Sequence, residues 1–276
     1  MPRQLKYNQA IAKALISNAD GIIEAIDKYL AKADDELSDV LADEGYADAE
    51  DSVKVINAMQ EEIAETLQNQ TDDLVEALAA EQDSGWAAAQ KKVSEMLDGD
   101  DIAEQVQEAA ADMFQTEVPK LATVYMQETD GDLVVDVIRQ RTKSWIASWS
   151  QRLGQLMKIN THQQITDIIQ RTIDQGESIE TLTRKIMDGG WRNEHYQARR
   201  VAVTEVLRAH SVAREEAIQQ SPSTDRKEWR HTGAHKNKPR PNHVDMDGQI
   251  VPKDKPFELQ GRDGVVYHPM YPRDPI

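Results

Sequence analysis

The sequence predicts a mainly α-helical protein with a small C-terminal α+β unit: an elongated helical N-terminal region followed by a compact domain with a few short strands. Apolar residues recur at helical spacing through most of the chain before Pro222. Aromatic residues make up only 5% of the chain, which leaves few large side chains for a compact interior and favours an elongated body. Most of the prolines lie from Pro222 onward, where the apolar residues form short runs typical of strands.

Residues 1–130 form the first of three predicted regions, an acidic helical one. A helical stripe of apolar side chains begins at Leu5, and Gly45 is expected to interrupt it. The aspartates within residues 98–101 predict the end of one helix and the start of the next, because an Asp side chain accepts hydrogen bonds from free amides at a helix N-terminus. Pro119 is expected to kink or restart that next helix, since proline removes a backbone N–H.

Residues 131–190 are predicted to be connecting helices. The first is expected from about residue 133 to residue 159. Its Trp145 and Trp149 are one turn apart and share a face. A base-stacking or cofactor role is conceivable for such a pair, but tryptophans at this spacing more often pack in a core or an interface, and we expect burial here.

Two more helices complete this connecting region. One is expected over residues 161–175, with Gly176 at its end. The other is expected over residues 177–187, with Ser178 as its cap and Gly189–Gly190 as its stop.

Residues 191–276 are predicted to be a separate C-terminal domain. It begins with a long helix over about 194–220, which ends before a Ser-Pro-Ser sequence. Three short runs after it are expected to be strands, namely residues 227–231, 249–252 and 264–268. The sequence therefore places the α+β unit at the end of the chain.

The charge is distributed unequally along the chain. Residues 1–136 carry 32 acidic and 9 basic side chains, whereas residues 137–276 carry 17 acidic and 23 basic ones. One interpretation is that the acidic part is a set of solvated helix faces. The other is that the two halves face different surroundings, with the basic half close to nucleic-acid phosphates, for example through the basic loop at 235–241.

Composition also excludes several classes of protein. The chain has no cysteine, so disulfides and thiolate metal sites are excluded. No run of about 18 apolar residues is present, and the N-terminus lacks the apolar stretch of a secretory signal. We therefore expect a soluble protein that is not exported.

Histidines and aspartates gather near the C-terminal end, at His235, His243, Asp245, Asp247 and His268. Imidazole and carboxylate groups are ligands for zinc or manganese, but their spacing matches no metal signature such as HExxH. Nucleophile-elbow and phosphate-binding glycine motifs are absent as well. We expect no catalytic residue, no metal and no cofactor. The alternative is a DNA-handling protein, such as a metal-dependent nuclease with His243 as general base.

Five short motifs follow one another in the last third of the chain, in the order Thr204-Glu205, Lys227-x-Trp229, Arg240-x-x-His243, Met246-Asp247-Gly248 and Phe257. This order resembles the phage Mu protein F-like minor head family, also called phage head morphogenesis proteins. The resemblance covers roughly residues 160–276, and the acidic N-terminal half carries no motif. Family members usually end in an Asn-Cys-Arg-Cys sequence, which this chain lacks.

The resemblance implies a structural virion protein and not an enzyme. It implies a position inside the head near the portal, with the host cytoplasm as the place of assembly. The partners that it implies are the portal protein, the major capsid protein or both, and the basic half adds proximity to packaged DNA. The expected tasks are head assembly, DNA packaging or genome delivery.

The motif residues are expected to define a fold and not a reaction site. Thr204 and Glu205 are predicted to form hydrogen bonds to the turn at residues 243–248, where Gly248 provides a backbone angle that a side chain hinders. The candidate structural or binding residues are Thr204, Glu205, Trp229, Arg240, His243, Asp245, Asp247, Gly248 and Phe257.

Overall fold

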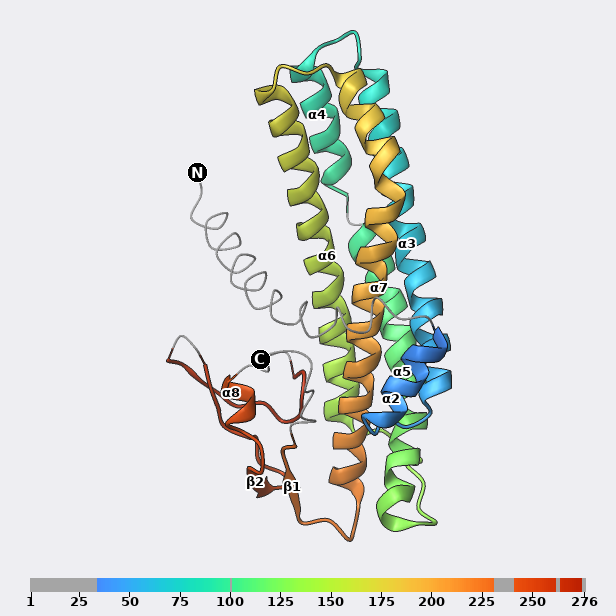
Figure 1. The fold of residues 1–276 in the computed structure, drawn as a ribbon, viewed down its shortest axis with the longest axis vertical. Coiled ribbons are helices and arrows are strands. Elements are labelled where there is room, and N and C mark those ends of the chain that lie inside the picture. Colours follow the sequence, from blue (N-terminus) through green and yellow to red (C-terminus); the bar gives the residue numbers. More distant parts are fainter. Residues whose placement is uncertain (1–33, 100, 231–240, 262–263, 275–276) are drawn as a thin grey trace. The chain divides into compact units, whose positions relative to one another are not determined.

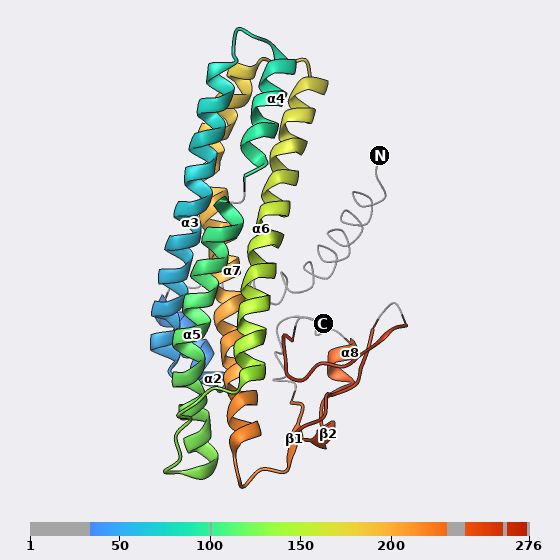
Figure 2. The same cartoon turned by 180° about the vertical axis from the view of Figure 1, so that it is seen from behind.

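The structure is a computed structural model that describes residues 34–99, 101–230, 241–261 and 264–274 (Figures 1 and 2). For residues 189–193 and His243 it describes the backbone alone. Within the described part, helices account for most residues, and the few short strands lie near the C-terminal end. The prediction of a mainly α protein with a small C-terminal α+β unit is confirmed.

Six longer helices precede the C-terminal strands within the described residues. They are α2 (Asp34–Asp43), α3 (Ala49–Ala80), α4 (Trp86–Leu97), α5 (Asp101–Asp130), α6 (Gln140–Asp174) and α7 (Ile179–Gln220). The C-terminal elements are β1 (Arg226–Glu228), the four-residue helix α8 (Pro241–Val244), β2 (Ile250–Pro252), β3 (Leu259–Gln260) and β4 (Val266–Tyr267). β1 pairs with β2 and β3 pairs with β4, both antiparallel.

The connection between α6 and α7 follows the predicted local signals. α6 ends at Asp174, and Gly176 has φ +67°, a conformation in which a side chain is strained. The hydroxyl of Ser178 then accepts a hydrogen bond from the Thr181 N–H at 3.2 Å. Ser178 is therefore the predicted cap, because it satisfies an amide that has no partner within the helix.

Two predicted helix ends are wrong, and the prediction for Pro119 is settled only in part. α5 continues through Pro119, which excludes a restart there but not a kink. α6 is one helix across residue 160, where two were predicted. α7 continues through Gly189–Gly190, although each glycine costs about 1 kcal/mol relative to alanine in a helix. Packing offsets this cost: Leu182 before the glycines and Ala198 after them are both fully buried.

Two smaller differences concern the ends of the predicted elements. α6 begins at Gln140 and not near residue 133, since β-branched residues occupy much of 133–138 and the Arg139 N–H donates to Glu216 instead of continuing a helix. β3 was not predicted, because a two-residue strand leaves no periodicity in the sequence.

The described chain divides into two compact units, each assembled from separate stretches. The first unit contains residues 57–111 and 147–202, and the second contains 34–56, 112–146 and everything from 203 onward. The three consecutive regions predicted from the sequence, 1–130, 131–190 and 191–276, remain a prediction.

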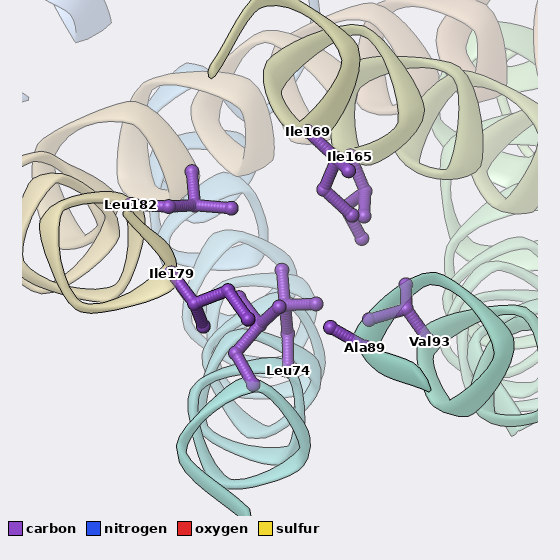
Figure 3. Close-up of a cluster of buried hydrophobic side chains, with 8 residues drawn as sticks. Leu74, Ala89, Val93, Ile165, Ile169, Ile179 and Leu182 are labelled. Carbon is purple, nitrogen blue, oxygen red and sulfur yellow. The ribbon is translucent and has the colours of Figure 1, made fainter. Parts of the chain in front are cut away.

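In the first unit, parts of α3, α4, α6 and α7 surround an apolar core (Figure 3). Leu78 and Leu182 are completely buried in it, and the Trp86 indole N–H donates to the Glu177 carbonyl at 3.3 Å. α5 and α6 approach closely elsewhere in this unit: a Cβ added to Gly154 meets the Ala103 carbonyl oxygen at 2.1 Å. The core in Figure 3 consists of Leu74, Leu78, Ala89, Val93, Ile165, Ile169, Ile179 and Leu182.

In the second unit, the last part of α7 is central. Leu207 and Ala213 on this helix are completely buried, as are Leu37 and Leu41 of α2 and Phe114 of α5. Trp145 is half-buried at the start of α6, where its ring meets the Phe114 ring edge-on with centroids 5.3 Å apart. Trp149, in the first unit, is 8% exposed, so the predicted burial of this tryptophan pair is confirmed for Trp149 and partial for Trp145. Within the described residues, no helix is long and apolar enough to cross a membrane.

Candidate functional site

The C-terminal strands enclose a small apolar core within the second unit. Trp229 and Phe257 meet edge-on with ring centroids 5.2 Å apart, and both side chains are almost fully buried. Met246 and Leu259 complete the buried cluster. A core of this size brings little apolar burial, so this substructure depends on further contacts with the helices.

Gly248 is exposed and pairs through its backbone with Trp229 beside this core. The Gly248 N–H donates to the Trp229 carbonyl at 2.8 Å, and the Trp229 N–H donates to the Gln249 carbonyl at 2.9 Å. Gly248 has φ +78°, which is the backbone conformation expected for it from the sequence. Trp229, Gly248 and Phe257 are thus brought together, as residues that define a local fold.

The two aspartates of the predicted cluster lie in a turn. Asp245 and Asp247 are exposed, and their N–H groups donate to the carbonyls of Pro241 and Val244 at 2.9 Å, which closes the turn after α8. Arg240 and the His243 side chain lie outside the described residues, as does His235. Among the side chains that are described, no group of three His, Asp or Glu residues is placed to hold a metal ion.

Thr204 and Glu205 lie on α7, where Glu205 is 2% exposed. The carboxylate of Glu205 forms an ion pair with Arg208, one turn further along the helix. The Nε of Arg208 donates to the Arg273 carbonyl at 3.0 Å, so this pair ties α7 to the C-terminal end of the described chain. The predicted hydrogen bonds from Thr204 and Glu205 to the 243–248 turn remain a prediction.

A second buried ion pair joins α7 to β1; its lysine, Lys227, belongs to a motif found in the sequence, but its partner Glu215 was not predicted. The Nζ of Lys227 lies 3.0 Å from both carboxylate oxygens of Glu215 and donates to the Met270 carbonyl at 2.7 Å. It also lies 5.2 Å from the centre of the Phe257 ring. Burial lowers the pKa of Lys227 and raises the pKa of Glu215, while the opposite charge of each partner counteracts this.

Glu216, the next residue on α7, is completely buried and holds the start of α6. Its carboxylate accepts hydrogen bonds from the Arg139 N–H at 2.7 Å, from the Arg139 Nε at 3.0 Å and from the Thr142 hydroxyl. Burial raises the pKa of this carboxyl, but the hydrogen bonds from Thr142, Arg139 and Gln220 outweigh it and hold the pKa below its usual value. Glu216 therefore acts as an ionised cap for α6.

His210 forms a further buried polar contact of α7 in this unit. The Ser52 hydroxyl lies 3.0 Å from the Asp48 carbonyl and 2.8 Å from His210 Nε2, and Tyr125 OH lies 2.8 Å from His210 Nδ1. If Ser52 donates to the carbonyl, His210 carries its proton on Nε2 and accepts from Tyr125. Burial lowers the pKa of His210 to about 3, with Arg214 and Arg273 adding to the effect. In this tautomer Ser52 donates to the Asp48 carbonyl and accepts from His210, which is a structural contact.

A cavity of about 80 Å³ lies between α6, α7 and the C-terminal end of the described chain. Asp274 borders it, accepts a hydrogen bond from the Met270 N–H at 2.8 Å, and has a pKa that burial raises. A cavity of this size, with both polar and apolar walls, suits a few water molecules and is small for a substrate. Its lining residues include Arg139, Arg141, Thr142, Trp145, Glu215 and Tyr271.

The sequence contains only a weak signal for these buried charges. Lys227 alternates with the exposed Arg226 and Glu228 in β1, so its burial follows from the two-residue period of a strand. The choice of Glu215 as its partner depends on how β1 folds back on α7, which no local pattern encodes. The arrangement as a whole is a set of mutually neutralised charges that fixes the C-terminal strands to α7.

Comparison with known proteins gives a family that matches the C-terminal part of the chain and a relative that matches nearly all of it. The family model for phage Mu protein F like protein matches residues 163–266, which extend from the later part of α6 through α7 to β4. The uncharacterized protein YqbB of Bacillus subtilis (strain 168) is 30% identical over 269 residues, which cover 94% of this chain and 86% of YqbB. No solved structure matches the chain.

The family match spans α7 and the strands that its buried ion pairs hold, so the resemblance carried by the sequence motifs and the observed substructure coincide. The similarity to YqbB extends over nearly the whole chain. The chain belongs to the phage Mu protein F-like family and is a phage head protein.

Proposed function

We propose that the chain is a minor head protein that lies inside the head, binds the portal protein or the capsid lining, and assists head assembly, DNA packaging or genome delivery. The observation that carries the proposal is the family match over 163–266. This segment contains α7 together with the strands that buried ion pairs of α7 hold in place. A structural role needs a unit that keeps its shape while it binds another protein. These ion pairs provide that rigidity.

The chemistry of the second unit supports a binding role over catalysis. Glu205, Glu215 and Glu216 each neutralise a cationic partner, which leaves their charges occupied in structural contacts. A catalytic acid or base instead faces a site that a substrate can enter. We therefore propose that the protein is not an enzyme.

The charge distribution supports a position between protein and DNA. Residues 137–166 carry five basic and no acidic side chains, in a chain whose net charge is −17. Arg141 and Lys143 of this stretch are exposed. Basic surfaces of this kind lie favourably near phosphates, whereas the acidic N-terminal half is repelled by them.

The proposal is tested with heads purified from phage that carry a stop codon in this gene, compared with wild-type heads. We expect the protein in wild-type heads by immunoblot, protected from protease until the heads are opened. In its absence we expect fewer heads filled with DNA or heads that fail to deliver it. A protein that is absent from purified wild-type heads would disprove the proposal.

The alternative of a metal-dependent nuclease that uses His243 has no support from the described side chains, and it has its own test. Purified chain and its His243→Ala variant are incubated with duplex DNA and Mn²⁺ or Mg²⁺. Cleavage by the wild type that is lost in the variant would favour the nuclease. We expect no cleavage by either protein.

A further inference from the structure

The connection between α5 and α6 exposes three large apolar side chains within five positions. Leu133, Val134 and Val137 are 42%, 51% and 66% exposed. The stretch 133–138 is neither helix nor strand, and four of its six residues are β-branched. Single exposed apolar residues are normal on protein surfaces, but three together in a short stretch of this composition indicate a contact surface.

This stretch is held in place and does not need to be ordered on binding. Val135 and Ile138 are buried, and the Val135 N–H donates to the Thr123 hydroxyl at 3.2 Å. At the other end, Gln220 Nε2 donates to the Val137 carbonyl at 3.0 Å. A partner therefore meets apolar side chains that are already positioned, which reduces the entropy cost of binding.

The backbone of the same stretch also offers hydrogen-bonding groups. Within the described part of the chain, the N–H groups of Val134 and Asp136 donate to no other residue. An extended partner segment that lies along residues 133–137 can accept from these groups while its apolar side chains cover Val134 and Val137. Recognition of extended peptides commonly combines these two kinds of contact.

Charge decides between the candidate partners. Asp132 and Asp136 are exposed on this stretch, and α5 ends next to it with Asp130. A second copy of the chain lying antiparallel on this stretch brings two sets of these carboxylates together, which is unfavourable. A segment with Lys or Arg side chains beside apolar ones is complementary to the carboxylates in charge and to the exposed valines in apolar contact.

We propose that residues 132–137 form a docking surface for an extended, apolar segment of another head protein that carries Lys or Arg opposite Asp132 and Asp136. The identification of the partner as a head protein rests on the proposed function. The chemistry of the segment rests on the exposed valines, the two carboxylates and the N–H groups of Val134 and Asp136, which donate to no other described residue.

The chemistry is tested with synthetic peptides that alternate valine with lysine or valine with glutamate, added to the full chain and followed by fluorescence anisotropy. We expect the lysine peptide to bind at least about tenfold more tightly than the glutamate peptide. Asp132→Lys with Asp136→Lys is expected to reverse this preference. Equal binding of both peptides, or binding of neither, would overturn the proposal.

The apolar contribution is tested with the double variant Val134→Asp, Val137→Asp, which is expected to lower binding of a neutral valine-threonine peptide by about tenfold or more. The matched control, Ile250→Asp with Val265→Asp, changes two equally exposed apolar residues elsewhere in the unit and is expected to leave binding unchanged. Circular dichroism of both double variants confirms that they are folded. An equal loss in the control would show non-specific apolar binding and contradict the proposal.

The partner is identified with a photo-crosslinking amino acid in place of Val137, in phage heads. We expect a crosslink to a Lys- or Arg-containing segment of the portal or capsid protein. A crosslink to a second copy, to residues 1–33 of the same chain, or to nothing while the protein is present in the heads would overturn the inference and leave the proposed function intact. Absence of the wild-type protein from the heads would contradict the proposed function instead.

Discussion

At the residue scale, the second unit depends on a few buried polar side chains that each have one specific partner. His210, Lys227 and Glu216 contribute little by burial alone, because removing a polar group from water costs free energy until its partner is in place. Each therefore selects one arrangement of the chain around α7. Replacing any of them is expected to lower the free energy of unfolding, and the pH dependence or the coupling to a partner differs from one residue to another.

The first prediction concerns His210. Its folded-state pKa of about 3 lies below the ordinary value of 6.5, so protonation favours the unfolded chain. Its contribution to stability is complete above pH 6.5 and is lost as the pH falls from there towards 3, by about 2 kcal/mol at pH 5. We expect the His210→Gln variant to be less stable at pH 7.5 but to lose less stability between pH 7.5 and 5 than the wild type.

Urea unfolding at the two pH values measures this difference. Glu215 and Asp274, whose pKa values are raised by burial, act in the opposite direction, but they are common to both proteins and cancel in the comparison. The charged neighbours Arg214 and Arg273 and the rings of Tyr46 and Tyr125 are unchanged as well. Parallel curves for the two proteins would show that His210 is not the titrating group.

The second prediction concerns the pair Lys227 and Glu215. Lys227→Met leaves the buried Glu215 without its cation and is expected to lower the free energy of unfolding by about 3–5 kcal/mol. The double variant with Glu215→Leu is expected to recover much of the loss, since two apolar residues leave no unpaired charge. Denaturant unfolding of the wild type, the two single variants and the double variant gives the coupling energy between Lys227 and Glu215. Strictly additive losses would show that the two residues do not interact.

An exposed ion pair serves as the control for this cycle. Lys255 and Asp254 lie 3.7 Å apart with both side chains about two-thirds exposed. Lys255→Met is expected to change stability by less than about 0.5 kcal/mol, because water screens such pairs.

At the element scale, the connection between α6 and α7 was predictable from local signals. Packing overrides the local stop signal at Gly189–Gly190, and a distant contact sets the start of α6. Gly176 and Ser178 act through the backbone of their own turn, so the sequence shows them directly. The start of α6 depends on Glu216, which lies 77 positions away from Arg139 in the chain. For the same reason the site was predicted only in part: Trp229, Gly248 and Phe257 were found as a fold-defining group, but the pairing of Lys227 with Glu215 was not.

The third prediction concerns the contact between α5 and α6 in the first unit. Gly-to-Ala substitution inside a helix usually stabilises it by about 1 kcal/mol. At position 154 the added Cβ meets a backbone oxygen of Ala103 at 2.1 Å, and backbone cannot move aside without shifting a helix. We therefore expect Gly154→Ala to be destabilising by about 1–3 kcal/mol in thermal or denaturant unfolding. A stabilised variant would show that the helices are further apart.

At the scale of the whole molecule, opposite charge at the two ends of the sequence is the property that most affects what the chain binds. A chain with a net charge of −17 is expected to bind duplex DNA weakly. Binding that does occur must involve the basic residues after position 136, and residues 137–166 are free of acidic side chains. The proposed proximity to packaged DNA can therefore be tested by measuring how the chain binds duplex DNA.

The fourth prediction is that DNA binding of the full chain depends on Arg141 and Lys143. Each basic group that neutralises a phosphate contributes about 0.9 to the slope of log affinity against log salt. Replacing both with Gln is therefore expected to weaken binding of duplex DNA and to reduce that slope by up to about 1.8. The matched control replaces Lys91 and Lys92, which are equally exposed but belong to the acidic half. Equal losses in the two double variants would mean that net charge alone governs binding, because each double variant removes two positive charges.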